Sequence, residues 1–172
     1  AHFDHVGLLP FTTPSIPVYA SRVTSKMMLA GEVFANQNRI SRDRFRELNS
    51  AETIEIGSLT ITPLAVDHSI PGCLAFLVEA DGTSLLYTGD LRLHGNRPTS
   101  HQAILDTLAG KRVDALIVEG THFGSDDEED LTELKLKTQI ERHVSENVGL
   151  VLAALSPQHM DRLHSFIHAA ER

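Results

Sequence analysis

Hydrophobic and polar residues alternate over residues 53–88 with the period of two that is typical of β-strands. Gly57-Ser58 and Asp81-Gly82 interrupt the alternation, and two-residue turns of this kind join antiparallel strands. The sequence therefore predicts two hairpins and four antiparallel strands in a row. Their strands are Thr53–Ile56, Leu59–Val66, Cys73–Glu79 and Ser84–Thr88.

The regions on either side of the hairpins combine helical spacing with short apolar runs. Before the hairpins we expect a strand at Pro17–Ala20 and a helix that Ser21 caps and that runs to Phe34. After them we expect helix Ser100–Leu108, strand Val113–Val118, helix Leu131–Asn147, strand Leu150–Leu155 and a helix capped by Ser156 with Pro157 at its first position. Hairpins followed by alternating helices and strands predict a mixed α/β fold built in layers.

Length and composition are those of a globular protein. The 172 residues are 41% hydrophobic and 22% charged, and no apolar run approaches the roughly 20 residues of a transmembrane helix. Cys73 is the only cysteine, which excludes an intrachain disulfide framework; no signal peptide is visible, so we expect a cytoplasmic protein. The chain opens inside a histidine cluster and closes within a predicted helix, so we expect it to be a piece of a longer protein.

The charge balance is acidic, with 15 Lys and Arg against 23 Asp and Glu and a net charge of −8. Such a chain should repel a polyanion unless basic side chains or metal ions collect at one place. Basic residues do outnumber acidic ones between Arg22 and Glu47. The stretch Arg39–Arg46 is either a nucleic-acid contact or a solvated face, and the sequence leaves both open.

Three segments carry side chains that bind metal ions. His2, Asp4 and His5 lie within four positions, and an extended segment followed by a turn would direct all three to one point. His68 and Asp90 each end a predicted hairpin strand, beside glycine-containing turns. Neighbouring strand ends can direct two side chains into one site, although either residue alone is more simply a structural turn residue.

Imidazole and carboxylate groups without cysteine suit zinc, iron or manganese. Two ions roughly 3.5–4 Å apart can share a hydroxide and stabilise both the attacking and the leaving oxygen of a displacement. Cys73 is expected to be a small buried hydrophobe, because no partner for a nucleophile accompanies it. The histidines of the predicted helices are expected on the surface: His101, His143, His159, His164 and His168.

These segments resemble the motifs of a known family. His2-Phe3-Asp4-His5 resembles the last four positions of the His-x-His-x-Asp-His motif of the metallo-β-lactamase fold, whose first histidine would precede Ala1. Asp67–Gly72 is similar to the later histidine motif of that fold in its RNase J-like form, and Leu86–Gly95 to the motif of the bridging aspartate. Val118–His122 is similar to the first acidic motif of the β-CASP nucleases, and Ser156–Leu163 to the entry to their inserted domain.

The resemblance implies a four-layer αββα fold, present in part. Residues 1–155 would be a partial metallo-β-lactamase-like domain and residues 156–172 the start of a β-CASP domain. It also implies two Zn²⁺ ions, with Mn²⁺ as a substitute, and a ribonuclease acting on RNA or on DNA, as an exonuclease, an endonuclease or both. The whole protein would be a homodimer without a membrane anchor, and this chain alone would be inactive.

The resemblance also implies roles for individual residues. His2 and His68 would bind one ion, Asp4 and His5 the other, and Asp90 would bridge them so that a shared hydroxide attacks phosphorus. Asp4, Asp90 and Glu119 form the implied catalytic set; Glu119 either orients or relays a proton, or it is a strand-end carboxylate that fixes a ligand histidine. His94 and His122 would approach the substrate.

Two other functions stay open at this point. The same fold could hydrolyse a small thioester, lactone or phosphodiester, although such enzymes lack the motifs at Glu119 and Ser156–Leu163. The chain could also belong to a degenerate subunit that takes part in RNA processing without cleaving RNA.

Overall fold

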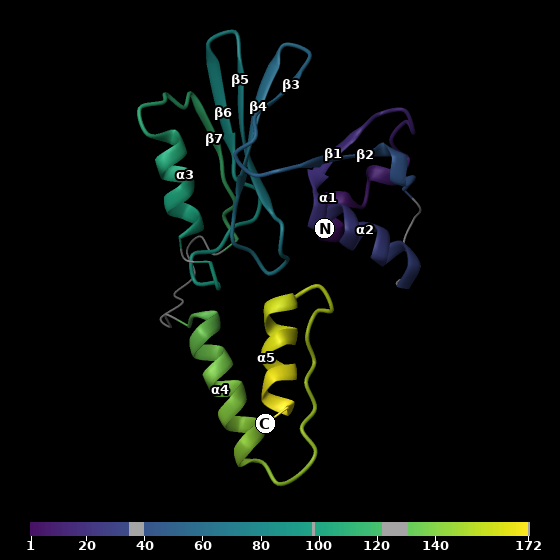
Figure 1. Cartoon of the computed structure of the whole chain (residues 1–172), viewed down its shortest axis with the longest axis vertical. Helices are drawn as coiled ribbons and strands as arrows, with labels where there is room; N and C mark the ends of the chain where they lie inside the picture. Colours follow the sequence, from purple (N-terminus) through teal and green to yellow (C-terminus); the bar gives the residue numbers. More distant parts are fainter. Residues whose placement is uncertain (35–39, 98, 122–130, 172) are drawn as a thin grey trace.

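The computed structural model describes residues 1–34, 40–97, 99–121 and 131–171. Its centre is a five-stranded sheet with the order β3-β4-β5-β6-β7 (Figure 1). The strands are β3 (Ile54–Ile56), β4 (Leu59–Ala65), β5 (Leu74–Ala80), β6 (Thr83–Tyr87) and β7 (Ala115–Ile117). Neighbours from β3 to β6 are antiparallel and β7 is parallel to β6, which confirms the two predicted hairpins and the strand that follows them.

A smaller two-stranded sheet is formed by parallel strands β1 (Val18–Ser21) and β2 (Phe45–Leu48). Helix α2 (Arg22–Phe34) follows β1, and the hydroxyl of Ser21 accepts a hydrogen bond from the backbone N–H of Thr24 at 3.1 Å, as expected of a cap. The sequence analysis missed β2, helix α1 (Phe3–Val6) and two short 3₁₀ helices, Leu9–Phe11 and Arg42–Arg44, all of four residues or fewer.

The main core lies between the large sheet and helix α3 (Ser100–Leu108), the segment predicted to be helical. Buried Leu64, Val66, Ala75, Leu77 and Leu86 contact partly buried residues of α3, among others. Burial of one such large side chain stabilises the fold by about 1.5–3 kcal/mol, so this core fixes the strands firmly. The segments after β4 and β6, which carry His68 and Asp90, therefore begin from rigid positions.

The elements form successive layers. Helix α3 lies on one side of the five-stranded sheet, and strands β1 and β2 with helix α2 lie on the other (Figure 1). This arrangement confirms the predicted mixed α/β class. In the described parts of the chain, no helix is both long enough and apolar enough to cross a membrane.

Helices α4 (Glu133–Glu146) and α5 (Met160–Ala170) pack against each other below the large sheet (Figure 1). Thr132 caps α4, because its hydroxyl accepts a hydrogen bond from the N–H of Lys135 at 3.2 Å. The extended segment between the helices runs back beside α5, so that both helices point the same way (Figure 1).

The predicted strand Leu150–Leu155 is wrong. The segment is extended but belongs to no sheet, and the side chains of Leu150 and Leu152 are each 84% exposed. The physical reason is its location beside α5 (Figure 1), where none of the strands described in the structure pairs with it.

The predicted cap of the last helix is also wrong. Ser156 and Pro157 belong to a turn, in which the carbonyl of Ser156 accepts a hydrogen bond from the N–H of His159 at 3.0 Å. Helix α5 begins only at Met160, and the ring of His159 caps it by accepting a hydrogen bond from the N–H of Arg162 at 3.3 Å.

Candidate metal centre

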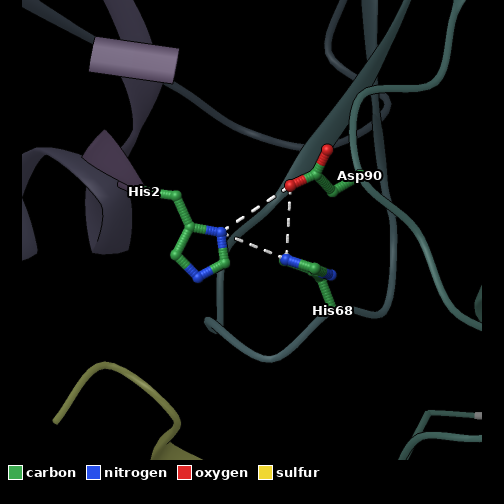
Figure 2. Close-up of side chains that lie close together, drawn as sticks. All are labelled: His2, His68 and Asp90. Carbon is green, nitrogen blue, oxygen red and sulfur yellow. Dashed lines mark hydrogen bonds and ion pairs between the residues drawn. The ribbon is translucent and has the colours of Figure 1, made fainter. Parts of the chain in front are cut away.

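Three side chains from distant parts of the sequence converge at the end of the large sheet. His2 comes from the N-terminal segment, His68 from the segment after β4, and Asp90 from the segment after β6 (Figure 2). Nε2 of His68 lies 3.3 Å from Nδ1 of His2 and 3.4 Å from Oδ2 of Asp90. Nδ1 of His2 lies 3.7 Å from the same carboxylate oxygen. Three possible ligand atoms therefore face one point.

A second group shares Asp90 with the first. Nε2 of His5 lies 3.0 Å from Oδ2 of Asp90 and 3.6 Å from Oδ2 of Asp4. In each group, one possible ligand atom per residue lies within 4.8 Å of the others. The structure thus brings together all five residues that the sequence analysis named as ligands, with Asp90 common to both groups.

The local conformation of the N-terminal ligands differs from the expected one. The carbonyl of His2 accepts hydrogen bonds from the N–H groups of His5 at 3.1 Å and Val6 at 3.2 Å, so these residues form one helical turn rather than an extended segment. His2 itself keeps an extended backbone before that turn. Asp90 lies between His2 and His5, which is why the helical turn still leaves both histidines beside one carboxylate.

The segment that follows His68 is anchored at two points. Ile70 is fully buried, and the carbonyl of Gly72 accepts a hydrogen bond from the hydroxyl of Thr24 on α2 at 3.3 Å. Burial lowers the pKa of His68, and neighbouring His2 adds to this effect while Asp90 opposes it. The neutral imidazole, the form that binds metal ions, is thereby favoured.

Glu119 acts on the Asp90 segment through the backbone. Its Oε1 accepts a hydrogen bond from the N–H of Leu91, the residue after Asp90, at 2.6 Å. This contact holds the backbone directly after Asp90 in place. His94 is exposed, and neither group of possible ligands includes it; His122 lies outside the described residues.

A buried ion network behind the centre was missed by the sequence analysis. Arg92 contacts three carboxylates: Nε lies 3.2 Å from Asp67, one terminal nitrogen 2.9 Å from Glu133, and the other 2.6 Å from Asp161. The side chains of Arg92, Asp67 and Glu133 are at most 7% exposed. The signal in the sequence was the charge of Asp67 and Arg92 beside apolar strands, but nothing local pairs them.

Two expected surface residues have structural roles. His159 is largely buried and its Nε2 lies 3.4 Å from Oε1 of Glu133, so it is not a surface histidine. Arg44 is buried and donates hydrogen bonds to the carbonyl of Ile16 at 3.1 Å and the hydroxyl of Thr12 at 2.7 Å. Arg44 is therefore unavailable to nucleic acid, and Arg39 lies outside the described residues.

A cavity of about 370 Å³ adjoins the centre. Its walls include His2, Asp90, Tyr19, Met28, Phe76 and Cys73. Burial raises the pKa of the Cys73 thiol, and Cys73 also packs against the main core, in line with the expected buried hydrophobe.

Comparison with known proteins decides the family. Residues 1–166 match the family model described as the beta-lactamase superfamily domain. The chain belongs to the metallo-β-lactamase superfamily. The crystal structure of a protein of unknown function from Enterococcus faecalis V583 shares the fold, with a TM-score of 0.71 and 24% identity over 90% of this chain and 40% of that one. The predicted fold class is confirmed, in partial form.

The curated relatives confirm the resemblance to the RNase J-like branch of the superfamily. Ribonuclease J of Mycolicibacterium smegmatis is 28% identical over 180 residues, 99% of this chain and 31% of the relative. The 5′ exonuclease Apollo of Gallus gallus is 30% identical over 123 residues, 70% of this chain and 24% of the relative. The chain therefore spans less than a third of the length of these two relatives.

The donor set fits the metal binding that the superfamily implies. Two imidazoles and a carboxylate form the first group, and one imidazole with two carboxylates forms the second. Nitrogen and oxygen donors of this kind suit zinc and manganese, and no thiolate belongs to either group among the described residues. His2, Asp4, His5, His68 and Asp90 are the residues available to hold metal ions.

Proposed function

We propose that this chain is the metal-binding part of a nuclease that hydrolyses phosphodiester bonds of RNA. The observation that carries the proposal is the position of Asp90, whose Oδ2 lies 3.4 Å from His68 and 3.0 Å from His5. One carboxylate placed between two sets of donors suits a pair of ions. The relatives named ribonuclease J and 5′ exonuclease Apollo support a nucleic acid as substrate.

In this proposal His2 and His68 would hold one ion, Asp4 and His5 would hold the other, and Asp90 would be shared by both. Zinc is the metal that the donor set favours, and manganese is the substitute. Bound ions would lower the pKa of a water molecule and neutralise negative charge on the phosphoryl oxygens. That neutralisation matters because the chain carries a net charge of −8, which by itself repels a polyanion.

The chain's own residues position these groups. Glu119 accepts the N–H of Leu91 and so fixes Asp90 next to the histidines of both groups. Asp4 is the most exposed of the five, with 75% of its side chain accessible, so its side of the centre faces the approaching phosphodiester. His94 and His122 are proposed to contact the substrate beyond the ions.

The extent of the functional unit is also part of the proposal. We place a partial metallo-β-lactamase-like domain at residues 1–155 and the start of a β-CASP domain at residues 156–172. The relatives are more than three times as long as the segment they share with this chain, so the rest of the protein would complete the RNA-binding groove. A cytoplasmic homodimer remains the prediction for the whole protein.

The test uses the whole protein, purified without chelators. Metal content is measured by inductively coupled plasma mass spectrometry, and cleavage is followed on labelled RNA, on the matching DNA and on a small thioester. About two ions per chain with RNA cleavage supports the proposal. Thioester hydrolysis without RNA cleavage assigns a small-molecule hydrolase instead, and RNA binding without metal or cleavage assigns a degenerate subunit.

A further inference from the structure

We propose that Arg92 is a positioning residue for the metal centre: it holds the segments of His68 and Asp90 together and ties both to helices α4 and α5. This inference rests on the proposed function, because it assigns Arg92 a role toward the same ions. Arg92 does not belong to either group of possible ligands and acts only through its neighbours.

Arg92 donates two hydrogen bonds to Asp67, the residue before His68. Its backbone N–H donates to the carbonyl of Asp67 at 2.9 Å, and its Nε donates to Oδ1 of the same residue at 3.2 Å. Asp67 immediately precedes His68, and Arg92 follows Asp90 by two positions. The two segments that supply ligands from the large sheet are therefore joined within two residues of each ligand.

The second carboxylate oxygen of Asp67 also binds the segment after Asp90. Oδ2 of Asp67 accepts a hydrogen bond from the N–H of Arg97 at 2.6 Å, so both carboxylate oxygens bind the segment after Asp90. Gly95 lies so close that a Cβ there would overlap the carboxylate of Asp67 and Nε of Arg92. The side chain of Asp67 is 1% exposed, so water does not compete for its carboxylate oxygens.

The remaining nitrogens of Arg92 reach the helix pair. They bind Glu133 at the start of α4 at 2.9 Å and Asp161 in the first turn of α5 at 2.6 Å. A guanidinium is a rigid planar fork, so three carboxylates at its three nitrogens fix its plane. The positions of α4 and α5, which lie below the sheet in Figure 1, are in this way linked to the spacing of His68 and Asp90.

Loss of Arg92 would leave the buried carboxylate of Asp67 without its cation, whereas Glu133 would keep Arg162. A buried carboxylate without a counter-ion draws in water or moves, which would displace the segment of Asp67. Displacement of outer partners of this kind typically weakens metal binding by roughly 10- to 100-fold. A lysine cannot replace the fork, because it offers one nitrogen instead of three.

The experiment measures zinc affinity of the whole protein by competition with a chromogenic chelator, and thermal unfolding of the metal-free form. The variants are Arg92→Met and Arg92→Lys. The matched control is Arg162→Met, because Arg162 donates to the same Glu133 at 2.9 Å and its side chain binds that residue rather than Asp67. This control weakens the same helix pair without touching the segment of His68.

We expect Arg92→Met to weaken zinc binding by roughly 10- to 100-fold, Arg92→Lys to recover only part of it, and Arg162→Met to keep wild-type affinity. Wild-type affinity in a folded Arg92→Met protein overturns the inference, as does an equal loss in Arg162→Met. If Arg92→Met fails to fold, the decision rests on Arg92→Lys, where wild-type affinity overturns it. A wild-type protein that binds no zinc refutes the proposed function itself.

Discussion

Oδ2 of Asp90 lies 3.0 Å from Nε2 of His5, although 85 positions separate the two residues. The contact docks the N-terminal helical turn onto the end of strand β6 and places one carboxylate within reach of every other possible ligand. The centre is thus a product of tertiary packing and not of one local motif. Its integrity should depend most on Asp90.

Asp90→Asn should abolish turnover in the whole protein while RNA binding stays nearly unchanged. The amide keeps the shape of the side chain but removes the negative charge that both groups share. We expect RNA cleavage to fall by more than about 100-fold, beyond the roughly 10- to 100-fold typical of outer partners. Cleavage assays with metal analysis and RNA-binding titrations check this, and retained activity would rule out the bridging role.

His68→Ala should reduce the zinc bound per chain, because it removes one imidazole of the first group. His143 on α4 provides a matched control, since it is exposed and belongs to neither group. Metal analysis of both variants should show a loss only in His68→Ala. Unchanged stoichiometry in that variant would remove His68 from the ligand set.

The two roles considered for Glu119 differ in what a glutamine can replace. Its oxygen accepts the N–H of Leu91 at 2.6 Å, and the amide oxygen of Glu119→Gln can accept the same hydrogen bond. We therefore expect Glu119→Gln to keep most activity and Glu119→Ala to lose roughly 10- to 100-fold, as for an outer partner. Equal losses in the pH-dependent cleavage rate of both variants would instead support proton relay.

Local patterns predicted the sheet well. Period-two alternation and Asp-Gly or Gly-Ser turns located the two hairpins, because both signals lie within the segments themselves. Strand β2 escaped notice because its pairing partner β1 lies 27 positions earlier in the register. The apolar run Leu150–Leu155 predicted a strand wrongly, since an apolar run does not show whether a partner strand is present.

The possible metal ligands could be predicted from the sequence, but the contacts that surround them could not. His2, His68 and Asp90 were foreseeable because metal-binding residue types stand at segment ends. The contacts of Arg92 with Asp67, Glu133 and Asp161 span 25, 41 and 69 positions, and no periodic pattern encodes such pairs. The helical turn at Phe3–Val6 was missed because four residues are too few for a helical period to show.

The free energy of unfolding should decrease as the pH is lowered, because His159 titrates. Burial lowers the pKa of His159 below the usual 6.5, and the charge of Arg162 lowers it further. The unfolded chain therefore takes up the proton first, so the free energy of unfolding decreases as pH falls from 6.5 toward the pKa of the folded state. The physical event is loss of the cap of α5, since a protonated Nδ1 cannot accept the N–H of Arg162.

His159→Asn isolates this effect, because asparagine caps helices without titrating. Thermal unfolding between pH 5 and 8 should show a wild-type loss about 1 kcal/mol larger than that of the variant, the usual contribution of a cap. The titration of His68 is common to both proteins and cancels in the difference. Identical pH profiles would show that His159 does not control this loss.

Gly72→Ala should destabilise the protein more than Gly82→Ala. Both glycines have positive φ, +85° and +74°, where a side chain costs roughly 1–3 kcal/mol. A Cβ at residue 72 would also lie 2.7 Å from the hydroxyl of Ser21 and from Cβ of Val23, whereas nothing lies within 4 Å at residue 82. The difference in unfolding free energy therefore reports the docking of α2 against the His68 segment.

Urea unfolding of the two variants measures that difference. We expect Gly82→Ala to lose only the cost of backbone strain and Gly72→Ala to lose more, because backbone or side chains must shift to admit the methyl group. Zinc binding should weaken in Gly72→Ala alone, since Gly72 follows His68 by four positions and its carbonyl contacts Thr24. Equal losses of stability, with equal zinc binding, would mean that the close contact between α2 and this segment does not constrain the metal centre.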